Sequence, residues 1–343
     1  MKLPAELDED LVELLRSHGS SVPERVRCNP ALVLGRAELH GLAAVVQQIL
    51  ADAGVELPAD LRLDLERRAM ARELDHAGHI AALQRIDAAF GDAGLEAVVL
   101  KGSAFAERYY ALPSGRGTSD TDLMVAEADL EAAARVLASL GYEQGSGPEE
   151  LRFRREHHHL HLANPAGAPL ELHFHAYRGF GSVLPSEPLV ARREPFAKLR
   201  RGAVGVLSKP DELVYLAVHA AAHRFIRLGW LYDIQLIVDR MTECELETAV
   251  ARARDWGFAR LLEFTGSMLQ DVLGYSVGVR MGLGRLGGMR LRMLHRIVGE
   301  PRSAIVRSAT RLVYGTALCD TFASAARHGA TASLSRARGL LAR

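Results

Sequence analysis

The sequence predicts an α+β protein, in which a small mixed sheet with its own helices is flanked by helical regions on both sides. Apolar residues recur at helical spacing through the first ninety residues and again after Gly181. Between these stretches, short apolar runs of strand length alternate with turn signals. A chain of 343 residues is also long enough for one α/β core with helical extensions.

These changes of pattern divide the chain into four expected regions. Residues 1–90 form an N-terminal helical region, residues 91–180 the α/β core, and residues 181–280 a C-terminal helical domain. Residues 281–343 begin as a glycine-rich linker and continue as a basic helical tail.

The N-terminal region is expected to consist of helices, and it contains no evident chemistry. Leucines recur at helical spacing between residues 7 and 15, and a similar pattern over residues 42–49 stops before Gly54. The run Pro-Ala-Asp at residues 58–60 then opens a long helix over residues 61–90.

The α/β core begins where the spacing of apolar residues changes from a helical period to short runs of strand length. Residues 95–100 form a short run rich in valine and leucine, which predicts a buried strand. Residues 113–117, with a proline and two glycines, predict a loop. The other expected elements of the core are a helix at residues 104–110, a strand at 122–125, a helix at 127–140, and strands at 151–154, 157–162 and 169–175.

The helical period returns after the core. Residues 207–212 carry a helix-start signature, with Ser208 as the expected N-cap. Further helices are expected at residues 231–238, 246–253 and 261–273, ahead of the glycine-rich run at residues 281–289.

The composition is that of an ordinary globular protein, with 48% apolar and 24% charged residues. It contains no uncharged apolar stretch long enough to span a bilayer, so we expect no membrane contact. The N-terminus is acidic and amphipathic, unlike a signal peptide, which favours a cytoplasmic protein. The three cysteines are scattered without a C-x-x-C pair, which argues against disulfides and against a thiolate zinc site.

The charge is distributed unevenly along the chain. The net charge is zero, but residues 285–343 hold eleven arginines against only Glu300 and Asp320, an excess of nine positive charges. A tail of this kind suits a polyanion or a partner protein. We favour the simpler interpretation of a solvated helical tail, because the whole chain is rich in arginine, with only four lysines.

Asp120 and Asp122 are the first candidates for chemistry. Side chains two residues apart in a strand project from the same face, so these carboxylates would repel each other without a cation between them. Mg²⁺ prefers hard oxygen ligands and usually keeps substrate phosphates in its coordination shell. The Asp pair therefore predicts a divalent-metal site.

A phosphate-binding loop is expected just upstream of the Asp pair. Gly102 allows the backbone to approach a phosphate closely, and Ser103 offers a hydroxyl group. The helix that follows would present its first amides and the positive end of its dipole to an anion. Lys101 is placed to neutralise phosphate charge.

Glu171 is the best candidate for the third carboxylate that completes most two-metal sites. It lies in a strand-like run whose same face carries His173 and His175. A D-x-D pair alone is common, and its simplest non-functional interpretation is a turn or a helix cap whose side chains face solvent. A Gly-Ser pair between strand and helix, an Asp pair on a second strand and an acid on a third are together far more specific.

Several runs of the chain resemble a known family. They are VVLKGS at residues 98–103, Tyr109 with Tyr110, Arg116, SDTDLMV at 119–125, Gly141 with Tyr142, ELHF at 171–174, His219 with His223, and LGWLYD at 228–233. These runs resemble the uncharacterised nucleotidyltransferase family of the DNA polymerase β-like superfamily. The chain departs from the superfamily pattern in the sixteen residues between Ser103 and Asp120, a longer gap than usual, and in a glutamate where aspartate is the commoner third acid.

The resemblance implies a nucleotidyltransferase that moves a nucleoside monophosphate from an NTP to an acceptor and releases pyrophosphate. It implies Mg²⁺ as the metal, with Mn²⁺ as the alternative, and ATP as the expected donor. The catalytic metal ligands would be Asp120, Asp122 and Glu171. The residues that bind nucleotide would be Lys101, Gly102, Ser103, Arg116, His173, His219 and His223.

Five histidines offer an alternative metal site. His157, His159 and His161 fall on one strand face, and His173 and His175 are placed to meet them from a neighbouring strand, a concentration that suits Zn²⁺. Milder roles are hydrogen bonds to carboxylates, contacts to phosphates or acceptance of a proton from the attacking group. We favour these roles, because the Asp pair lies nearby.

His219 and His223 lie four residues apart on a predicted helix and share a face, as metal-ligating pairs do. The stretch lacks the glutamate of the H-E-x-x-H motif, so we favour a packed helix whose histidines bond Asp233 or the nucleotide.

Two other functions remain open at this point. A phosphotransferase or a phosphohydrolase would use the same acidic residues, and a non-catalytic nucleotide-binding protein would recruit a partner through its helical flanks and arginine-rich tail. The acceptor of a nucleotidyltransferase would be a small molecule, a peptide, a protein or an RNA end, among which the sequence does not choose.

Overall fold

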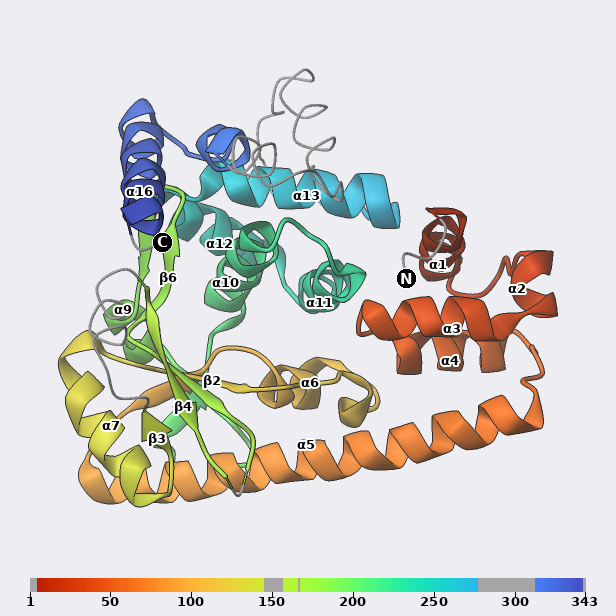
Figure 1. Cartoon of the computed structure of the whole chain (residues 1–343), viewed down its shortest axis with the longest axis horizontal. Helices are drawn as coiled ribbons and strands as arrows, with labels where there is room; N and C mark the ends of the chain where they lie inside the picture. Colours follow the sequence, from red (N-terminus) through yellow and green to blue (C-terminus); the bar gives the residue numbers. More distant parts are fainter. Residues whose placement is uncertain (1–4, 145–156, 166, 277–311, 342–343) are drawn as a thin grey trace.

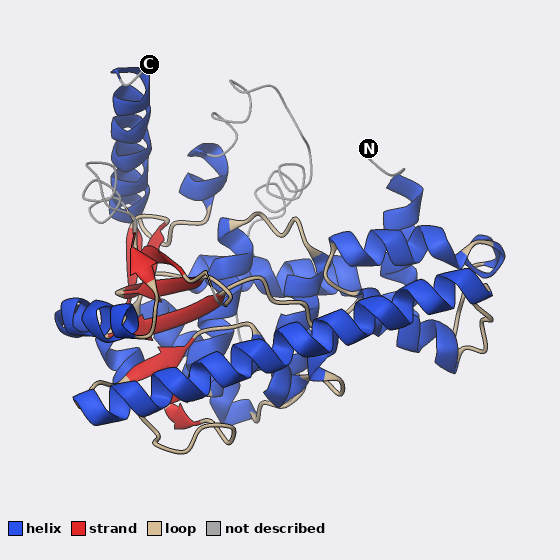
Figure 2. Ribbon diagram, turned by 60° about the horizontal axis from the view of Figure 1, so that its bottom comes forward, coloured by secondary structure: helices blue, strands red, loops and turns tan. Residues whose placement is uncertain are grey.

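The computed structural model describes residues 5–144, 157–165, 167–276 and 312–341 (Figure 1). A mixed seven-stranded sheet lies toward one end of the molecule, with helices against both of its faces. The first helices lie toward the other end, and the long helix α5 (Ala59–Ala93) runs between the two (Figure 2). The α+β class that the sequence predicts is therefore confirmed.

Four short helices precede α5 and agree with the helical pattern of the N-terminal region. Their bounds are Ala5–Ser17 (α1), Glu24–Cys28 (α2), Pro30–Leu39 (α3) and Ala43–Asp52 (α4). Leu11 and Leu14 of α1 belong to the same buried cluster as the C-terminal helices. The first helices thus pack directly on the C-terminal half of the chain. The division into four regions stays a prediction.

Helix α5 contains the predicted helix at residues 61–90 and extends it at both ends. It ends at Gly94, whose φ of 67° places it in the left-handed conformation that a glycine C-cap adopts without strain. Its last turns bury Leu83, Ile86 and Phe90 in the core on one face of the sheet. This packing fixes the long helix beside the strands that carry the acidic residues.

The sheet has the strand order β3-β4-β5-β2-β1-β9-β8. Its strands, in chain order, are β1 (Ala97–Val99), β2 (Thr121–Val125), β3 (Glu143–Gln144), β4 (His159–Ala163), β5 (Leu170–His173), β8 (Glu194–Pro195) and β9 (Val204–Val206). Strand β2 is antiparallel to β1 and parallel to β5, which in turn is antiparallel to β4. The predicted strands at residues 95–100, 122–125 and 157–162 are therefore present with small shifts of their ends.

The predicted strand at residues 169–175 is divided in two. Strand β5 ends at His173, and a separate hairpin of β6 (His175–Gly179) and β7 (Ser182–Pro185) follows. The amides of Phe174 and His175 both donate to the carbonyl of His158, so the chain bends out of the sheet at that point. The predicted strand at residues 151–154 lies outside the described residues.

The two faces of the sheet carry two separate cores, because side chains alternate along each strand. Leu123 and Val125 of β2 face α5 and α7 (Leu130–Ser139). Met124 faces the opposite core with Val98 of β1 and the C-terminal helices. Asp122 shares the face of Met124 by the same alternation. The acidic residues therefore point toward the C-terminal helices and away from α5.

The C-terminal half consists mainly of helices, as predicted. They are α9 (Glu187–Ala191), α10 (Lys209–Ala222), α11 (Leu228–Val238), α12 (Glu243–Asp255), α13 (Ala259–Leu273) and α16 (Phe322–Leu341). Ser208 occupies the N-cap position of α10, but its hydroxyl donates to Asp211 Oδ2 at 2.9 Å and makes no cap bond to a backbone amide. A different helix, α13, is capped by a distant side chain: the carboxyl oxygens of Asp320 accept hydrogen bonds from its first two amides, those of Ala259 and Arg260.

Part of the predicted basic tail is described, and it is helical. Helix α16 covers residues 322–341, whereas the glycine-rich run at residues 281–289 lies outside the described residues. Among the helices of the described part of the chain, none combines the length and the apolar character needed to cross a bilayer.

Candidate active site

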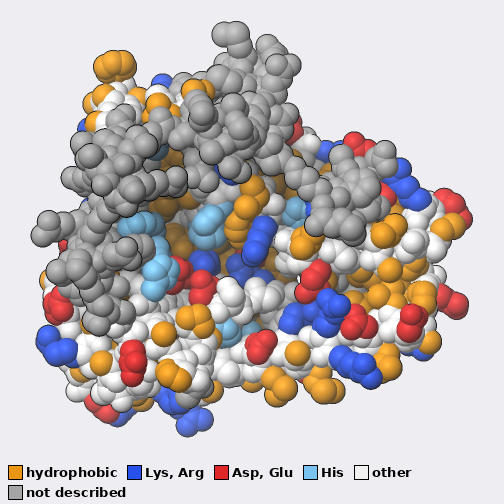
Figure 3. Space-filling model, viewed as in Figure 1, with side chains coloured by type: hydrophobic (Ala, Val, Ile, Leu, Met, Phe, Trp, Pro, Cys, Tyr) orange, Lys and Arg blue, Asp and Glu red, His pale blue; other side chains and the backbone are white. Residues whose placement is uncertain are grey.

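Asp120 and Asp122 lie at the edge of a pocket of about 520 Å³ between the sheet and the C-terminal helices. The pocket is hollowed into the face seen in Figure 3, where histidines, acidic groups and basic groups gather around it. Asp122 belongs to β2 and is 1% exposed, whereas Asp120 precedes the strand and is half-buried. The predicted Asp pair therefore points into one cavity.

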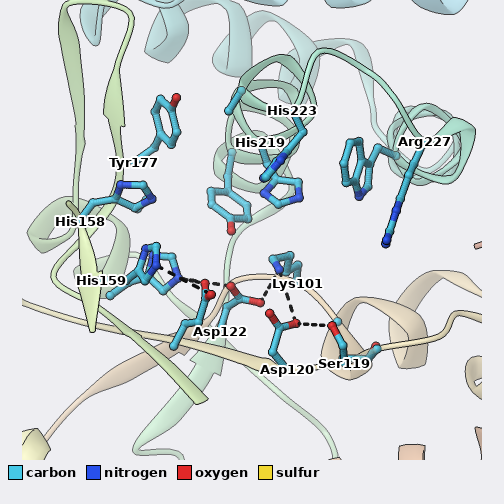
Figure 4. A pocket seen from close by; sticks show the side chains of 18 of the residues that line it. Lys101, Ser119, Asp120, Asp122, His158, His159, Tyr177, His219, His223 and Arg227 are labelled. Atoms are coloured by element: carbon cyan, nitrogen blue, oxygen red, sulfur yellow. Dashed lines mark hydrogen bonds and ion pairs between the residues drawn. The ribbon is translucent and has the colours of Figure 1, made fainter. Parts of the chain in front are cut away.

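Lys101 stands between the two aspartates (Figure 4). Its Nζ lies 2.8 Å from Asp122 Oδ2 and 3.8 Å from Asp120 Oδ1. Burial alone would lower the pKa of Lys101, but attraction to the two carboxylates outweighs burial and raises it. Burial and the neighbouring charge of Asp122 raise the pKa of Asp120. This end of the pocket therefore holds two carboxylates and one ammonium group.

Glu171 lies beside Asp122, because β2 and β5 pair these two residues in register. His173, two residues further along β5, stands between them. Its Nε2 is 3.2 Å from Asp122 Oδ1 and 3.5 Å from Glu171 Oε2. Burial lowers the pKa of His173, but hydrogen bonds to the two carboxylates outweigh burial and raise it. A protonated His173 would therefore hold the two acids together.

The three predicted acids form a row, with Lys101 between Asp120 and Asp122 and His173 between Asp122 and Glu171. Ligand atoms of Asp122, Glu171 and His173 all lie within 4.8 Å of one another, close enough to share one ion. Asp120 belongs to no such group of three among the described residues. Joint coordination of one ion by all three acids would thus require Lys101 to move away from the Asp pair.

The Gly102-Ser103 pair lies next to the Asp pair despite the long gap in sequence. Gly102 has a φ of 73°, and a Cβ atom there would come within 3.0 Å of the Thr118 side chain and 3.7 Å of the Asp120 carbonyl. The loop before β2 therefore folds back over Gly102. Ser103 begins α6 (Ser103–Tyr109), and its buried hydroxyl has no hydrogen-bond partner among the described residues.

Arg116 also lines the pocket, but its guanidinium group already has a partner. Its Nε and Nη2 donate to both carboxyl oxygens of Asp233 on α11, at 2.7–3.1 Å. Tyr110 donates to the same carboxylate at 2.7 Å. Of the two partners expected for the histidines of α10, Asp233 is therefore wrong, and the nucleotide stays a prediction. Arg116 reaches Asp233 from the loop before β2, and Tyr110 reaches it from the C-cap of α6.

His219 and His223 of α10 form the far wall of the pocket with Trp230 of α11. The ring centroids of the two histidines are 4.8 Å apart, and those of His219 and His223 lie 5.3 and 5.1 Å from Trp230. Burial, helped by the charge of Lys101, lowers the pKa of both histidines. The wall is therefore aromatic and uncharged at neutral pH.

The histidine cluster on β4 and β5 differs in membership from the prediction. His159 contacts both His161 and His173, and His158 joins them. Alternation within the predicted strand at residues 157–162 had placed His158 on the opposite face, but β4 begins only at His159. Burial lowers the pKa of His158 to about 2 and that of His159 to about 4. His175 leaves the cluster, because it lies on β6 with its Nε2 3.7 Å from Glu127.

The N-terminal region contributes one residue that sequence reasoning missed. His79 of α5 is buried, with Nδ1 3.0 Å from Thr121 Oγ1 and Nε2 3.3 Å from the Thr118 carbonyl. It therefore ties the loop that carries Asp120 to the long helix. Its only signal in the sequence is a histidine on a helix face that is otherwise largely apolar.

The chain matches the model of a known family. The model of a family described as uncharacterised nucleotidyltransferase matches residues 29–274, which include all the residues of the pocket and most of the helices around it. A search of curated proteins found no match.

Proposed function

The chain belongs to this family of uncharacterised nucleotidyltransferases, and we propose that it moves a nucleoside monophosphate from an NTP to an acceptor with the help of Mg²⁺. One observation carries the proposal. The acidic row of Asp120, Asp122 and Glu171 opens into the same pocket as Gly102, whose neighbour Ser103 keeps a buried hydroxyl without a partner among the described residues.

The residues present fit Mg²⁺ and a polyphosphate. Carboxylate oxygens are the hard ligands that Mg²⁺ prefers, and substrate phosphates complete its shell. Gly102 has a positive φ, and a side chain there would meet Thr118, so glycine allows the loop before β2 to pack against this turn and brings the Asp pair beside it. Ser103 does not itself line the pocket, but it directly follows Gly102, and its hydroxyl would be a donor for a substrate phosphate. Mn²⁺ would suit the same oxygen ligands.

The Mg²⁺ ion would be held by Asp120, Asp122 and Glu171, and when bound it neutralises phosphate charge and lowers the pKa of an acceptor hydroxyl. The flexible stem of Lys101 allows its ammonium to leave the Asp pair for the phosphates. His173 keeps Asp122 and Glu171 side by side through its hydrogen bonds. These residues thus supply positioning and charge, which account for most catalysis in phosphoryl chemistry.

The far wall of the pocket would receive the nucleoside. His219, His223 and Trp230 present uncharged aromatic surfaces, on which a base can stack. The acceptor oxygen would then bond to the α-phosphorus as the bond from that phosphorus to the β-phosphate oxygen breaks. Pyrophosphate leaves, and the acceptor proton passes to solvent or to a nearby base. ATP is the expected donor.

Radiolabelled nucleotides test this function directly. The purified chain is incubated with Mg²⁺, cell extract and each NTP in turn, labelled at the α-phosphate or at the γ-phosphate. Transfer of the α-label to an acceptor, with pyrophosphate release, supports the proposal. Transfer of the γ-label would indicate a phosphotransferase, free phosphate a phosphohydrolase, and nucleotide binding without turnover a non-catalytic protein.

The proposed function leaves the identity of the acceptor to be determined. Identification of the α-labelled species by mass spectrometry separates a small molecule, a peptide, a protein and an RNA end. A role for the basic tail in acceptor binding would show as loss of labelling when Arg336, Arg338 and Arg343 are replaced by glutamine, with nucleotide binding unchanged.

A further inference from the structure

Two imidazoles and one carboxylate meet on neighbouring strands beside the acidic row. The antiparallel pairing of β4 with β5 places His161 opposite Glu171 and His159 opposite His173. His159 and His161 are two residues apart in β4, so they project from the same face as Glu171. This placement follows from strand register alone, and it brings nitrogen and oxygen donors together next to the pocket.

The donor atoms lie close enough together to surround a small metal ion. Glu171 Oε1 lies 3.3 Å from His161 Nδ1 and 3.8 Å from His159 Nε2. One ligand atom from each of the three residues lies within 4.8 Å of the other two. With metal–ligand bonds of about 2.1 Å, the ligand atoms of a tetrahedral site are roughly 3.4 Å apart. The side chains would therefore need only small adjustments to enclose an ion.

We propose that His159, His161 and Glu171 bind a transition-metal cation of the Zn²⁺ class. Imidazole nitrogen with a single carboxylate suits Zn²⁺, Co²⁺ or Fe²⁺, whereas Mg²⁺ prefers a shell of oxygen. Three protein ligands leave a coordination position open, as in catalytic rather than structural metal sites. The side chain of His161 is 61% exposed, so an ion can reach the site from solvent.

Glu171 connects this site to the acidic row. Its Oε1 faces His159 and His161, whereas its Oε2 faces His173, which also contacts Asp122. One carboxylate therefore contacts the two histidines of β4 with one oxygen and His173 of the acidic row with the other. An ion on the histidine side would share Glu171 with the Mg²⁺ of the proposed function, but its binding does not depend on nucleotidyl transfer.

A second set of imidazoles lies close by and must be distinguished from this one. His158, His159 and His173 also bring ligand atoms within 4.8 Å of one another. His173, however, is engaged with Asp122 and Glu171 through its Nε2, and it is almost fully buried. The set that contains His161 and Glu171 is open to solvent and includes a negative charge, which favours a divalent cation.

Binding of the metal alone tests the proposal. The full chain is stripped with a chelator and titrated with Co²⁺ in excess Mg²⁺, without nucleotide, while visible d–d absorption reports nitrogen ligation, and Zn²⁺ competition gives the relative affinity. One equivalent is expected to bind. His159→Asn and His161→Asn should each weaken binding at least about tenfold, whereas the control His175→Asn, on β6, should bind like the wild type.

Three results would overturn the proposal. The first is Co²⁺ binding that His159→Asn and His161→Asn leave unchanged, and the second is the absence of nitrogen-ligated Co²⁺ in the wild type. The third is loss of binding in His158→Asn with full binding in His161→Asn, which would assign the ion to the other imidazole set. Thermal unfolding shows whether each variant is folded. Because His161 is exposed, its replacement is expected to disturb the fold least.

Variants also separate this proposal from the proposed function. Asp120→Asn should lose nucleotidyl transfer and keep Co²⁺ binding, because Asp120 belongs to neither imidazole set. Glu171→Gln should lose both. If the chain transfers no nucleotide but still binds Co²⁺ through His159 and His161, the metal site stands and the proposed function fails.

Discussion

Lys101 and Asp122 form a buried ion pair, with the lysine Nζ 2.8 Å from Asp122 Oδ2 and only 3.8 Å from Asp120. The ammonium thus occupies the place between two carboxylates that a divalent cation would take. A charge at this position offsets the repulsion within the Asp pair when no metal is bound. The same ammonium would then compete with Mg²⁺, or move to the phosphates that arrive with it.

Replacement of Lys101 by methionine tests this relationship through stability. Without metal, Lys101→Met should lower the free energy of unfolding by about 3 kcal/mol, the low end for a broken buried pair, because His173 still contacts Asp122. Saturating Mg²⁺ should restore more stability to the variant than to the wild type. The measurement is chemical unfolding with and without Mg²⁺.

Lys209 provides the matched control for this comparison. It pairs with Glu245 at 3.0 Å, but both side chains are about one third exposed, so Lys209→Met should change stability by less than about 1 kcal/mol. Equal effects of Mg²⁺ on Lys101→Met and on the wild type would contradict the assignment of the Asp pair as a cation site.

Removal of either aspartate charge should abolish transfer with the fold intact. Asp120→Asn and Asp122→Asn keep the side-chain shape but remove a ligand charge, so α-label transfer should fall at least about a hundredfold. Asp92→Asn is the control, because that carboxylate is exposed, pairs with Arg201 and does not line the pocket. Undiminished transfer in both pocket variants would refute the proposed catalytic role.

Acid should destabilise the protein partly through His158. Burial depresses its pKa from 6.5 to about 2, so between these values the unfolded chain binds a proton that the folded chain excludes. Stability contributed by this group is therefore full above pH 6.5 and falls as the pH decreases, by at most about 1.4 kcal/mol per pH unit.

His158→Gln should remove this part of the pH dependence. Urea unfolding of both proteins from pH 5 to pH 8, with a chelator present to exclude metal effects, would show a shallower slope for the variant below pH 6.5. Parallel slopes across that range would mean that His158 titrates normally in the folded protein.

The sequence predicts that Asp122 and Glu171 lie on one face of the sheet, because strand alternation needs only local spacing; their roles stay predictions. Asp122 and Glu171 each fall on the face that alternation assigns, and register then pairs them. Strands β8 and β9 escape prediction. The two residues of β8 are too few to show a period, and Gly205 interrupts the apolar residues of β9, whereas β1 lies in a longer run of valine and leucine.

Contacts between distant segments lie beyond such local reasoning. Asp233 binds Arg116, which is 117 positions away, and not the histidines of the adjacent helix. The histidines of α10 pack against Trp230 instead. The partner of a buried charge depends on how α6 and the following loop pack against α11. The hydrophobic periodicity of the sequence does not predict that packing.

His79 illustrates how a residue without substrate contact is expected to influence the reaction. It does not line the proposed nucleotide pocket, but it bonds Thr121 Oγ1 and the Thr118 carbonyl on either side of Asp120. His79→Phe keeps an aromatic ring and removes both bonds, which should cost about 1–3 kcal/mol of stability. The larger effect should be on the placement of Asp120.

A positioning role for His79 would lower kcat for transfer and leave KM for the NTP nearly unchanged, because the aromatic wall of the pocket is intact. His79→Gln retains a donor and an acceptor and should recover part of the lost kcat. Steady-state kinetics of both variants, at a temperature where each is fully folded, make the test. A rise in KM without a change in kcat, or equal kcat in the two variants, would show that His79 serves stability alone.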